Sequence, residues 1–198
     1  RVFMPAVIYI FSLCTFTFGL SEFVVAGLVS AISMDLHESI SQVGSAIAAY
    51  ALGAAIGAPI ITALLANWRD KTVLLLTLGV LAAGSVAISL APDVLTLHGV
   101  RFIIGLAHGV FMAVASNAAV KLVDPVRAGR ALSLVWMGLT LSIAFGVPLG
   151  TFFGSYWSWR MVFLAIGGLG LISTAGLVLL MRQHPRSSSH RATHLKHS

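Results

Sequence analysis

Apolar residues in this chain run in six continuous stretches, separated by short polar segments. The stretches lie at about 6–32, 43–66, 73–91, 95–119, 131–153 and 161–181. Each is about as long as the ~20 residues with which an α-helix crosses the hydrocarbon core of a bilayer. The runs are unbroken rather than alternating, which favours helices over the strands of a membrane barrel. The pattern predicts an all-α integral membrane protein with one six-helix domain over residues 1–181.

The composition indicates that lipid is the solvent of this domain. Hydrophobic residues make up 58% and charged residues 9% of the 198 residues, whereas soluble domains carry roughly 25% charged residues. The single cysteine, Cys14, excludes an internal disulfide framework, and the seven histidines follow no tight metal-ligand spacing. No motif supplies a nucleophile, a metal cage or a phosphate cradle. We therefore expect no catalytic residue, no cofactor and no metal.

The distribution of charge predicts topology rather than a nucleic-acid partner. The net charge of +6 is spread over short loops, without the basic stripe and interleaved aromatic residues of a nucleic-acid surface. Lys and Arg gather after spans two, four and six, while the alternate loops contain Asp35, Glu38 and Asp93. Basic loops face the cytoplasm, so we expect a multi-pass protein of the plasma (inner) membrane with both termini cytoplasmic. Residues 182–198 are polar and basic, as is typical of a cytoplasmic tail or linker.

Small residues recur at four-residue spacing in three of the predicted spans. They are Gly53 and Gly57 in span two, Gly105 and Gly109 in span four, and Gly146, Gly150 and Gly154 in span five. Such spacing lets helix backbones approach closely in lipid, and ordinary bundle packing explains the first pair. Span five also contains Pro148 inside the glycine run. A proline there removes a backbone donor, which predicts a bend or rocking point.

Glu22 places a carboxyl group inside the first predicted span. An ionisable group at membrane depth usually serves function or a specific partner. One interpretation is that Glu22 takes up and releases a proton or binds substrate. The other is a static carboxyl group, neutral or paired, that only ties helices together.

Span four carries Arg101 and His108 on one helical face with Gly105 and Met112. This mixture of charge, small residues and imidazole suits a cavity wall better than lipid. An arginine near the outer end of a span can also extend its head group to the interface. His108 could relay protons near neutral pH, or simply be bonded to a neighbouring backbone carbonyl.

Four segments are similar to those of one transporter family. Ser21–Leu28 (SEFVVAGL), Arg101–Gly109 (RFIIGLAHG), Gly146–Gly150 (GVPLG) and Trp159–Phe163 (WRMVF) carry the likeness. In order and spacing they resemble the major facilitator superfamily, specifically the amino-terminal half of proton-linked drug or sugar efflux permeases. The resemblance implies a three-plus-three inverted repeat that forms half of a twelve-helix fold. It also implies a small-molecule substrate, protons as coupling ions, and a coupling role for the arginine.

Two features depart from the family pattern. The loop after span two keeps basic character in Arg69, Asp70 and Lys71, but Ala66 stands where the family has an acidic residue. The cytoplasmic gate that the family places in this loop is therefore degenerate here. The chain also corresponds to one half of the family fold, which implies a second six-helix half or a homodimer partner.

These observations predict a transporter that exports a drug or sugar in exchange for protons, present as a half-length chain or as a fragment of a longer one. Glu22, Arg101 and His108 are the candidate coupling and cavity residues. Gly146, Pro148 and Gly150 are the candidate residues of a moving helix. An integral-membrane assembly or accessory protein is the alternative, and it predicts a closed bundle in which Glu22 and Arg101 pair away from any cavity. A membrane enzyme is less consistent with the sequence.

Overall fold

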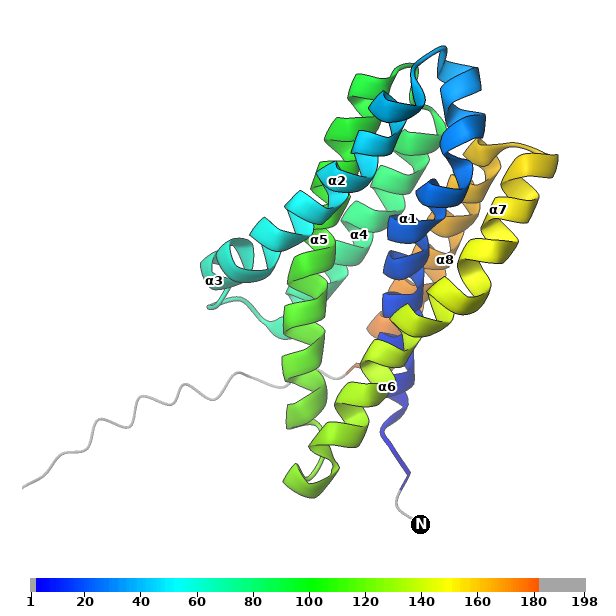
Figure 1. Ribbon diagram of the computed structural model, residues 1–198. Coiled ribbons are helices and arrows are strands. Elements are labelled where there is room, and N and C mark those ends of the chain that lie inside the picture. The colour runs from blue at the N-terminus through cyan, green and yellow to red at the C-terminus, as the bar shows by residue number, and fades with distance from the viewer. Residues whose placement is uncertain (1–2, 182–198) are drawn as a thin grey trace, which may run out of the picture.

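The computed structural model describes residues 3–181, and all regular structure in this range is helical. The elements are α1 (Ala6–Leu36), α2 (Ile40–Ile56), η1 (Gly57–Ile61), α3 (Thr62–Leu64), α4 (Asp70–Ser89), α5 (Val94–Lys121), η2 (Pro125–Arg127), α6 (Ala128–Leu141), η3 (Ser142–Gly146), α7 (Val147–Tyr156) and α8 (Trp159–Leu180). They form six spans that are long and apolar enough to cross a membrane, because α2–η1–α3 and η2–α6–η3–α7 are each one interrupted span. Successive spans run in opposite directions (Figure 1). The predicted all-α fold with six spans is confirmed, and the predicted tail at 182–198 lies outside the described residues.

Short polar residues begin the helices at one end of the bundle. The Ser39 hydroxyl accepts a hydrogen bond from the Gln42 amide at the start of α2 (3.1 Å). The Asp93 carboxylate accepts one from the Thr96 amide at the start of α5 (2.7 Å). This second bond lowers the pKa of Asp93 below its ordinary value. Both residues satisfy amide groups that the first turn of a helix leaves unpaired.

The spans pack as two related triplets. The first triplet is α1, α2–α3 and α4, and the second is α5, α6–α7 and α8. The second span of each triplet packs mainly on the first span of the other: α2 lies against α5, and α6–α7 lie against α1. The third spans, α4 and α8, pack on each other. This reciprocal pattern is that of a three-plus-three inverted repeat.

Both second spans are interrupted by a π-helical segment near a proline. Pro59 lies within η1, and Pro148 follows η3 by two residues. A proline inside a helix cannot donate to the carbonyl four residues earlier, and its ring crowds that carbonyl. A local π turn changes the spacing and accommodates it. The predicted distortion at Pro148 therefore has a counterpart at Pro59 in the other triplet.

The same two spans are the least covered by the rest of the bundle. In their most apolar 18-residue stretches, only 17% of the residues of the second span and 22% of the fifth are buried, against 67% for α1. Large apolar side chains such as Leu52, Phe145 and Phe152 are more than half exposed on them. α1 and α5 lie inside, while α2–α3 and α6–α7 present broad apolar faces outward.

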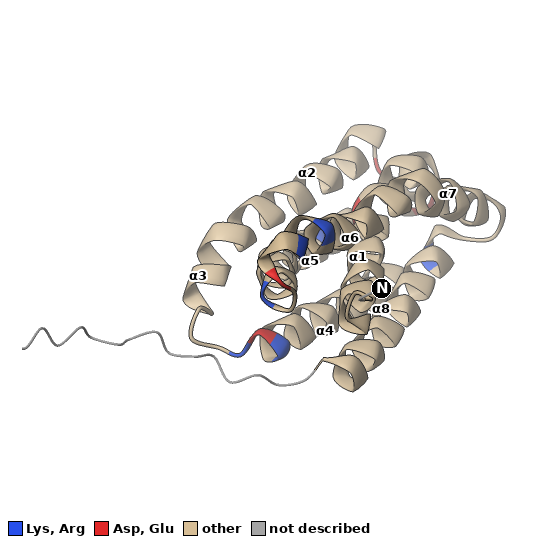
Figure 2. Ribbon diagram, turned by 90° about the horizontal axis from the view of Figure 1, so that it is seen from below, with Lys and Arg blue, Asp and Glu red and all other residues tan. Residues whose placement is uncertain are grey.

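One end of the bundle is rich in charged residues. Figure 2 views the molecule from below and shows Lys and Arg at the start of α4 and around the α5–α6 connection. In the α4 segment, the Lys71 ammonium donates to the Val178 carbonyl of α8 (3.1 Å), and Asp70 is the first residue of the helix. The predicted gate loop thus ties α4 to the end of α8.

A polar cluster ties three spans together at the opposite end. The Asp35 carboxylate accepts hydrogen bonds from the Trp159 indole (3.0 Å) and from Nε of Arg160 (3.2 Å). Nη1 of Arg160 donates to the carbonyls of Ser89 (3.0 Å) and Ala91 (2.9 Å). These contacts join the ends of α1 and α4 to the beginning of α8.

Candidate functional site

Glu22 and His108 meet near the midpoints of α1 and α5. Oε2 of Glu22 lies 3.2 Å from Nδ1 of His108. The His108 side chain is 6% exposed and that of Glu22 is 19% exposed. The pair is thus largely removed from the surface, while the carboxyl group keeps some access. It joins the first spans of the two triplets at membrane depth.

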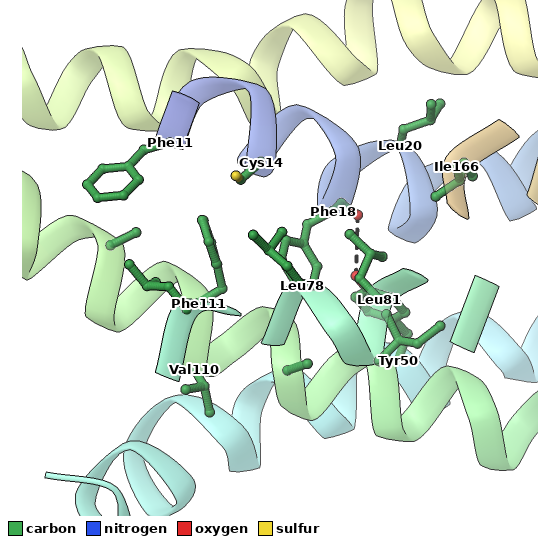
Figure 3. Close-up of a cluster of buried hydrophobic side chains, with 14 of the residues drawn as sticks. Phe11, Cys14, Phe18, Leu20, Tyr50, Leu78, Leu81, Val110, Phe111 and Ile166 are labelled. Atoms are coloured by element: carbon green, nitrogen blue, oxygen red, sulfur yellow. Dashed lines mark hydrogen bonds between the residues drawn. The ribbon is translucent and has the colours of Figure 1, made fainter. Parts of the chain in front are cut away.

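Tyr50 on α2 completes this cluster. Its hydroxyl lies 3.1 Å from Nδ1 of His108 and 3.3 Å from the carbonyl oxygen of Phe18. The Phe18 ring stacks on the imidazole with a centroid separation of 5.0 Å. Figure 3 shows Tyr50 and Phe18 in the apolar core, with the hydrogen bond between them dashed. His108 is held by groups from α1 and α2.

Glycines bring α2 and α5 close enough for these contacts. A Cβ atom on Gly105 would lie against the Tyr50 carbonyl oxygen, and one on Gly53 against that of Phe102. A Cβ on Gly109 would lie against the Ala54 carbonyl. The four-residue spacing in the sequence thus corresponds to backbone contact between the two helices.

Arg101 is fully buried, with 0% exposure. Its Nη1 donates to the Ser21 carbonyl, Nη2 to the Glu22 carbonyl (3.0 Å), and Nε to the Ala46 carbonyl (3.3 Å). Its guanidinium carbon lies 4.5 Å from the centre of the Tyr50 ring. The head group is directed into the α1–α2–α5 interface and not to the membrane surface. Its hydrogen bonds go to the main chain of Glu22 rather than to the carboxylate.

A cavity of about 560 Å³ adjoins the Glu22–His108 pair. Glu22 and His108 line it together with Phe23, Met112 and Trp136. The cavity lies between α1, α2, α5 and α6, where the two triplets face each other. Arg101 is not among the residues that line it. Of the three predicted coupling residues, two therefore face a cavity and the third lies behind them.

The glycine–proline segment of the fifth span lies against another part of α1. A Cβ on Gly146 would lie 3.1 Å from a methyl group of Leu20, and one on Gly150 would lie 2.7 Å from a methyl group of Val24. Pro148 is exposed. The two glycines thus allow α7 to pack closely on α1, and the proline faces away from this contact.

Tyr50 is the site residue that the sequence analysis missed. Ionisable residues are easy to identify in apolar spans because their charge is rare there. A tyrosine is common in membrane helices, so Tyr50 did not stand out. The available signal was its position three residues before Gly53, in the segment that approaches span four most closely.

Comparison with known proteins shows which family the chain resembles. The profile of the Major Facilitator Superfamily matches residues 11–198. The chain is 34% identical over 170 residues to the uncharacterized MFS-type transporter YtbD of Bacillus subtilis (strain 168), covering 86% of this chain and 43% of the relative. It is 32% identical over 175 residues to a chloramphenicol resistance protein of Streptomyces lividans, covering 88% of this chain and 45% of the relative.

A solved structure shares the fold. The bacterial homologue of the human lysosomal transporter Spinster, in an inward-facing and unoccupied conformation, matches with a TM-score of 0.74 at 18% sequence identity. The match covers 92% of this chain and 44% of that one.

The chain belongs to the Major Facilitator Superfamily, a family of membrane transporters. It spans a little under half the length of the curated relatives it matches.

Proposed function

We infer that this chain is one half of a transporter that exports a small organic molecule, a drug or a sugar, in exchange for protons. The Glu22–His108 pair carries the proposal because it joins two titratable groups at the wall of a cavity between the two triplets. A carboxyl group that is partly buried but reachable from a cavity can exchange a proton during a transport cycle. The chloramphenicol resistance relative supports a drug as the exported molecule.

The second half of the fold belongs to the same proposal. The exposed apolar faces of α2–α3 and α6–α7 flank the cavity, so a second six-helix unit, or a second copy of this chain, would close it. We place the protein in the inner membrane with both termini in the cytoplasm, because the basic end of the bundle is the end at which the first span begins (Figure 2).

The alternative is an accessory protein without transport of its own. Its strongest support comes from Arg101. This side chain is locked between helices away from the cavity. Glu22, however, lines the cavity. An assembly role would not need a carboxyl group there.

The test is Glu22→Gln in a complete transporter that contains this chain. The amide keeps the size of the side chain but cannot cycle a proton. We expect proton-driven efflux to fall to background, measured with a panel of drugs and sugars that includes chloramphenicol, the compound named for one relative. Substrate exchange without a gradient should persist, because it needs no net proton movement. Proton-driven efflux at the wild-type rate in the Gln variant would refute the proposal.

A further inference from the structure

We propose that Tyr50 is the positioning residue of the proton site: it fixes the proton of His108 on Nδ1 and holds it there when Glu22 leaves the pair. This proposal rests on the proposed function only for its role in transport. Its structural content concerns the buried cluster and can be tested separately.

The hydrogen-bond partners of the Tyr50 hydroxyl set the position of its proton. The Phe18 carbonyl oxygen can only accept, so the Tyr50 hydroxyl donates to it. The Tyr50 oxygen therefore presents a lone pair to Nδ1 of His108, 3.1 Å away. An imidazole nitrogen that faces a lone pair must carry a proton. Tyr50 thus selects the tautomer in which His108 is protonated at Nδ1.

The Nδ1 proton then has two acceptors. One is Oε2 of Glu22 at 3.2 Å, and the other is the Tyr50 oxygen at 3.1 Å. When Glu22 takes up a proton from the cavity or turns toward a substrate, the N–H group of His108 keeps the phenol oxygen as partner. Without that oxygen, the same event would strand a buried N–H group, which is costly. Because Tyr50 keeps the N–H group of His108 hydrogen-bonded, the Glu22 carboxyl group can move away from His108 at a lower cost.

Arg101 holds Tyr50 in place. Three backbone carbonyls, from Ser21 and Glu22 on α1 and from Ala46 on α2, fix the guanidinium group. The guanidinium carbon lies over the Tyr50 ring, 4.5 Å from the ring centre, an arrangement stabilised by attraction between cation and ring. The buried arginine thus acts on the proton site through the tyrosine.

Few other charged groups face this cluster. Among the described residues, the titratable groups with a contact in this cluster are Glu22 from α1 and Tyr50 from α2, which contact His108, and Arg101 from α5, which contacts Tyr50. α6 contributes Trp136 and Leu139 to the adjoining cavity, and neither side chain titrates. A change in the pH response of His108 can therefore be traced to a small set of groups.

Tyr50→Phe removes the hydroxyl and leaves a ring under Arg101. The spectroscopic test uses a complete transporter that contains this chain, labelled with ¹⁵N-histidine in lipid nanodiscs, with the His108 signals assigned by His108→Gln. We expect the wild-type ring to show one tautomer, protonated at Nδ1. Tyr50→Phe combined with Glu22→Gln removes both the phenol oxygen and the carboxylate that accept the Nδ1 proton, and this double variant should show a mixture of tautomers. Tyr9→Phe makes the same chemical change at an exposed site on α1 and should leave the His108 signals unchanged.

A second variant keeps the test decisive if Tyr50→Phe fails to fold. In Glu22→Gln, His108 should remain protonated at Nδ1, because the Tyr50 oxygen still requires it. Loss of the Nδ1 tautomer in Glu22→Gln, or the same Nδ1 tautomer in Glu22→Gln with and without Tyr50→Phe, would overturn the proposal.

A transport assay distinguishes a failure of this proposal from a failure of the proposed function. In a complete transporter, Tyr50→Phe should shift the pH midpoint of efflux toward acid by about 0.5–1 unit, the scale of one lost neutral hydrogen bond, and Tyr9→Phe should not. An unshifted midpoint alongside normal proton-driven efflux would contradict the role of Tyr50 alone. Efflux without any proton dependence would contradict the proposed function, while the nitrogen spectra would still decide the tautomer.

Discussion

Arg101 shows how backbone carbonyls can hold a buried charge inside a membrane protein. Its fork of N–H groups reaches carbonyls on α1 and α2 at once, and its guanidinium carbon lies over the Tyr50 ring. A guanidinium group reaches such separated acceptors with three nitrogens in a rigid fork, whereas an ammonium group has a single nitrogen. The residue therefore joins three helices behind the Glu22–His108 pair.

Arg101→Lys tests this role. Lysine keeps the charge but has one donor nitrogen in place of three, so it loses at least one of the three hydrogen bonds to carbonyls, at a cost of about 1.5–3 kcal/mol for a bond from a charged group. We expect a lower melting temperature in detergent and efflux reduced by at least ~10-fold. Arg130→Lys, at an exposed position at the start of α6, is the matched control. Near-normal stability and efflux in Arg101→Lys would mean that the head group lies at the membrane surface.

The residues of the site could be predicted from the sequence, but their contacts could not. Glu22, Arg101 and His108 are prominent because ionisable groups in apolar spans are rare. Which of them meet depends on how α1 and α5 are rotated about their axes, and periodicity within one helix does not fix this. The pairing of Glu22 with His108, and the use of Arg101 on backbone carbonyls, therefore required the structure.

At the scale of elements, the two π segments distinguish the second span of each triplet from the rest. Both lie beside a proline and in the spans least covered by the bundle. A helix with a loosened hydrogen-bond ladder can bend at lower cost than a regular one. We expect these segments to be the points at which α2–α3 and α6–α7 flex.

Pro148→Ala should restore the missing donor and remove the crowding that the π turn accommodates. Thermal stability should hold or rise, by less than the ~3 kcal/mol that separates proline from alanine in a helix interior. Turnover should fall several-fold, because the straightened span exchanges more slowly between inward- and outward-open states. Pro125→Ala, in the short turn before α6, is the control. Unchanged turnover in Pro148→Ala would mean that Pro148 serves only the packing of the helix.

The sequence predicted the number and approximate positions of the membrane-spanning helices better than any other part of the fold. Continuous apolar runs of bilayer length leave little alternative in lipid, and short connections impose antiparallel neighbours. The π segments were only partly foreseeable: Pro148 indicated distortion, but the matching one at Pro59 was not anticipated. The cluster of Asp35 with Arg160 was also missed, because its partners lie at the ends of helices that are far apart in the sequence.

At the scale of the whole molecule, the bundle is closed on one side and open on the other. α4 and α8 cover α1 and α5 from behind, whereas α2–α3 and α6–α7 leave large apolar faces and the cavity uncovered (Figure 1). Together with the partial coverage of its relatives, this supports a transport unit larger than the chain. In mild detergent the isolated chain should associate with a second copy or lose its fold.

The most direct measurement is of proton flux in liposomes. A complete transporter that contains this chain would be reconstituted with a pH-sensitive dye inside, and drugs and sugars, chloramphenicol first, would be added outside. We predict a substrate-dependent pH change that requires both halves, with none from the 198-residue chain alone. Substrate-dependent proton flux by a monomer of the isolated chain, or substrate transport by the complete protein without proton movement, would contradict the account.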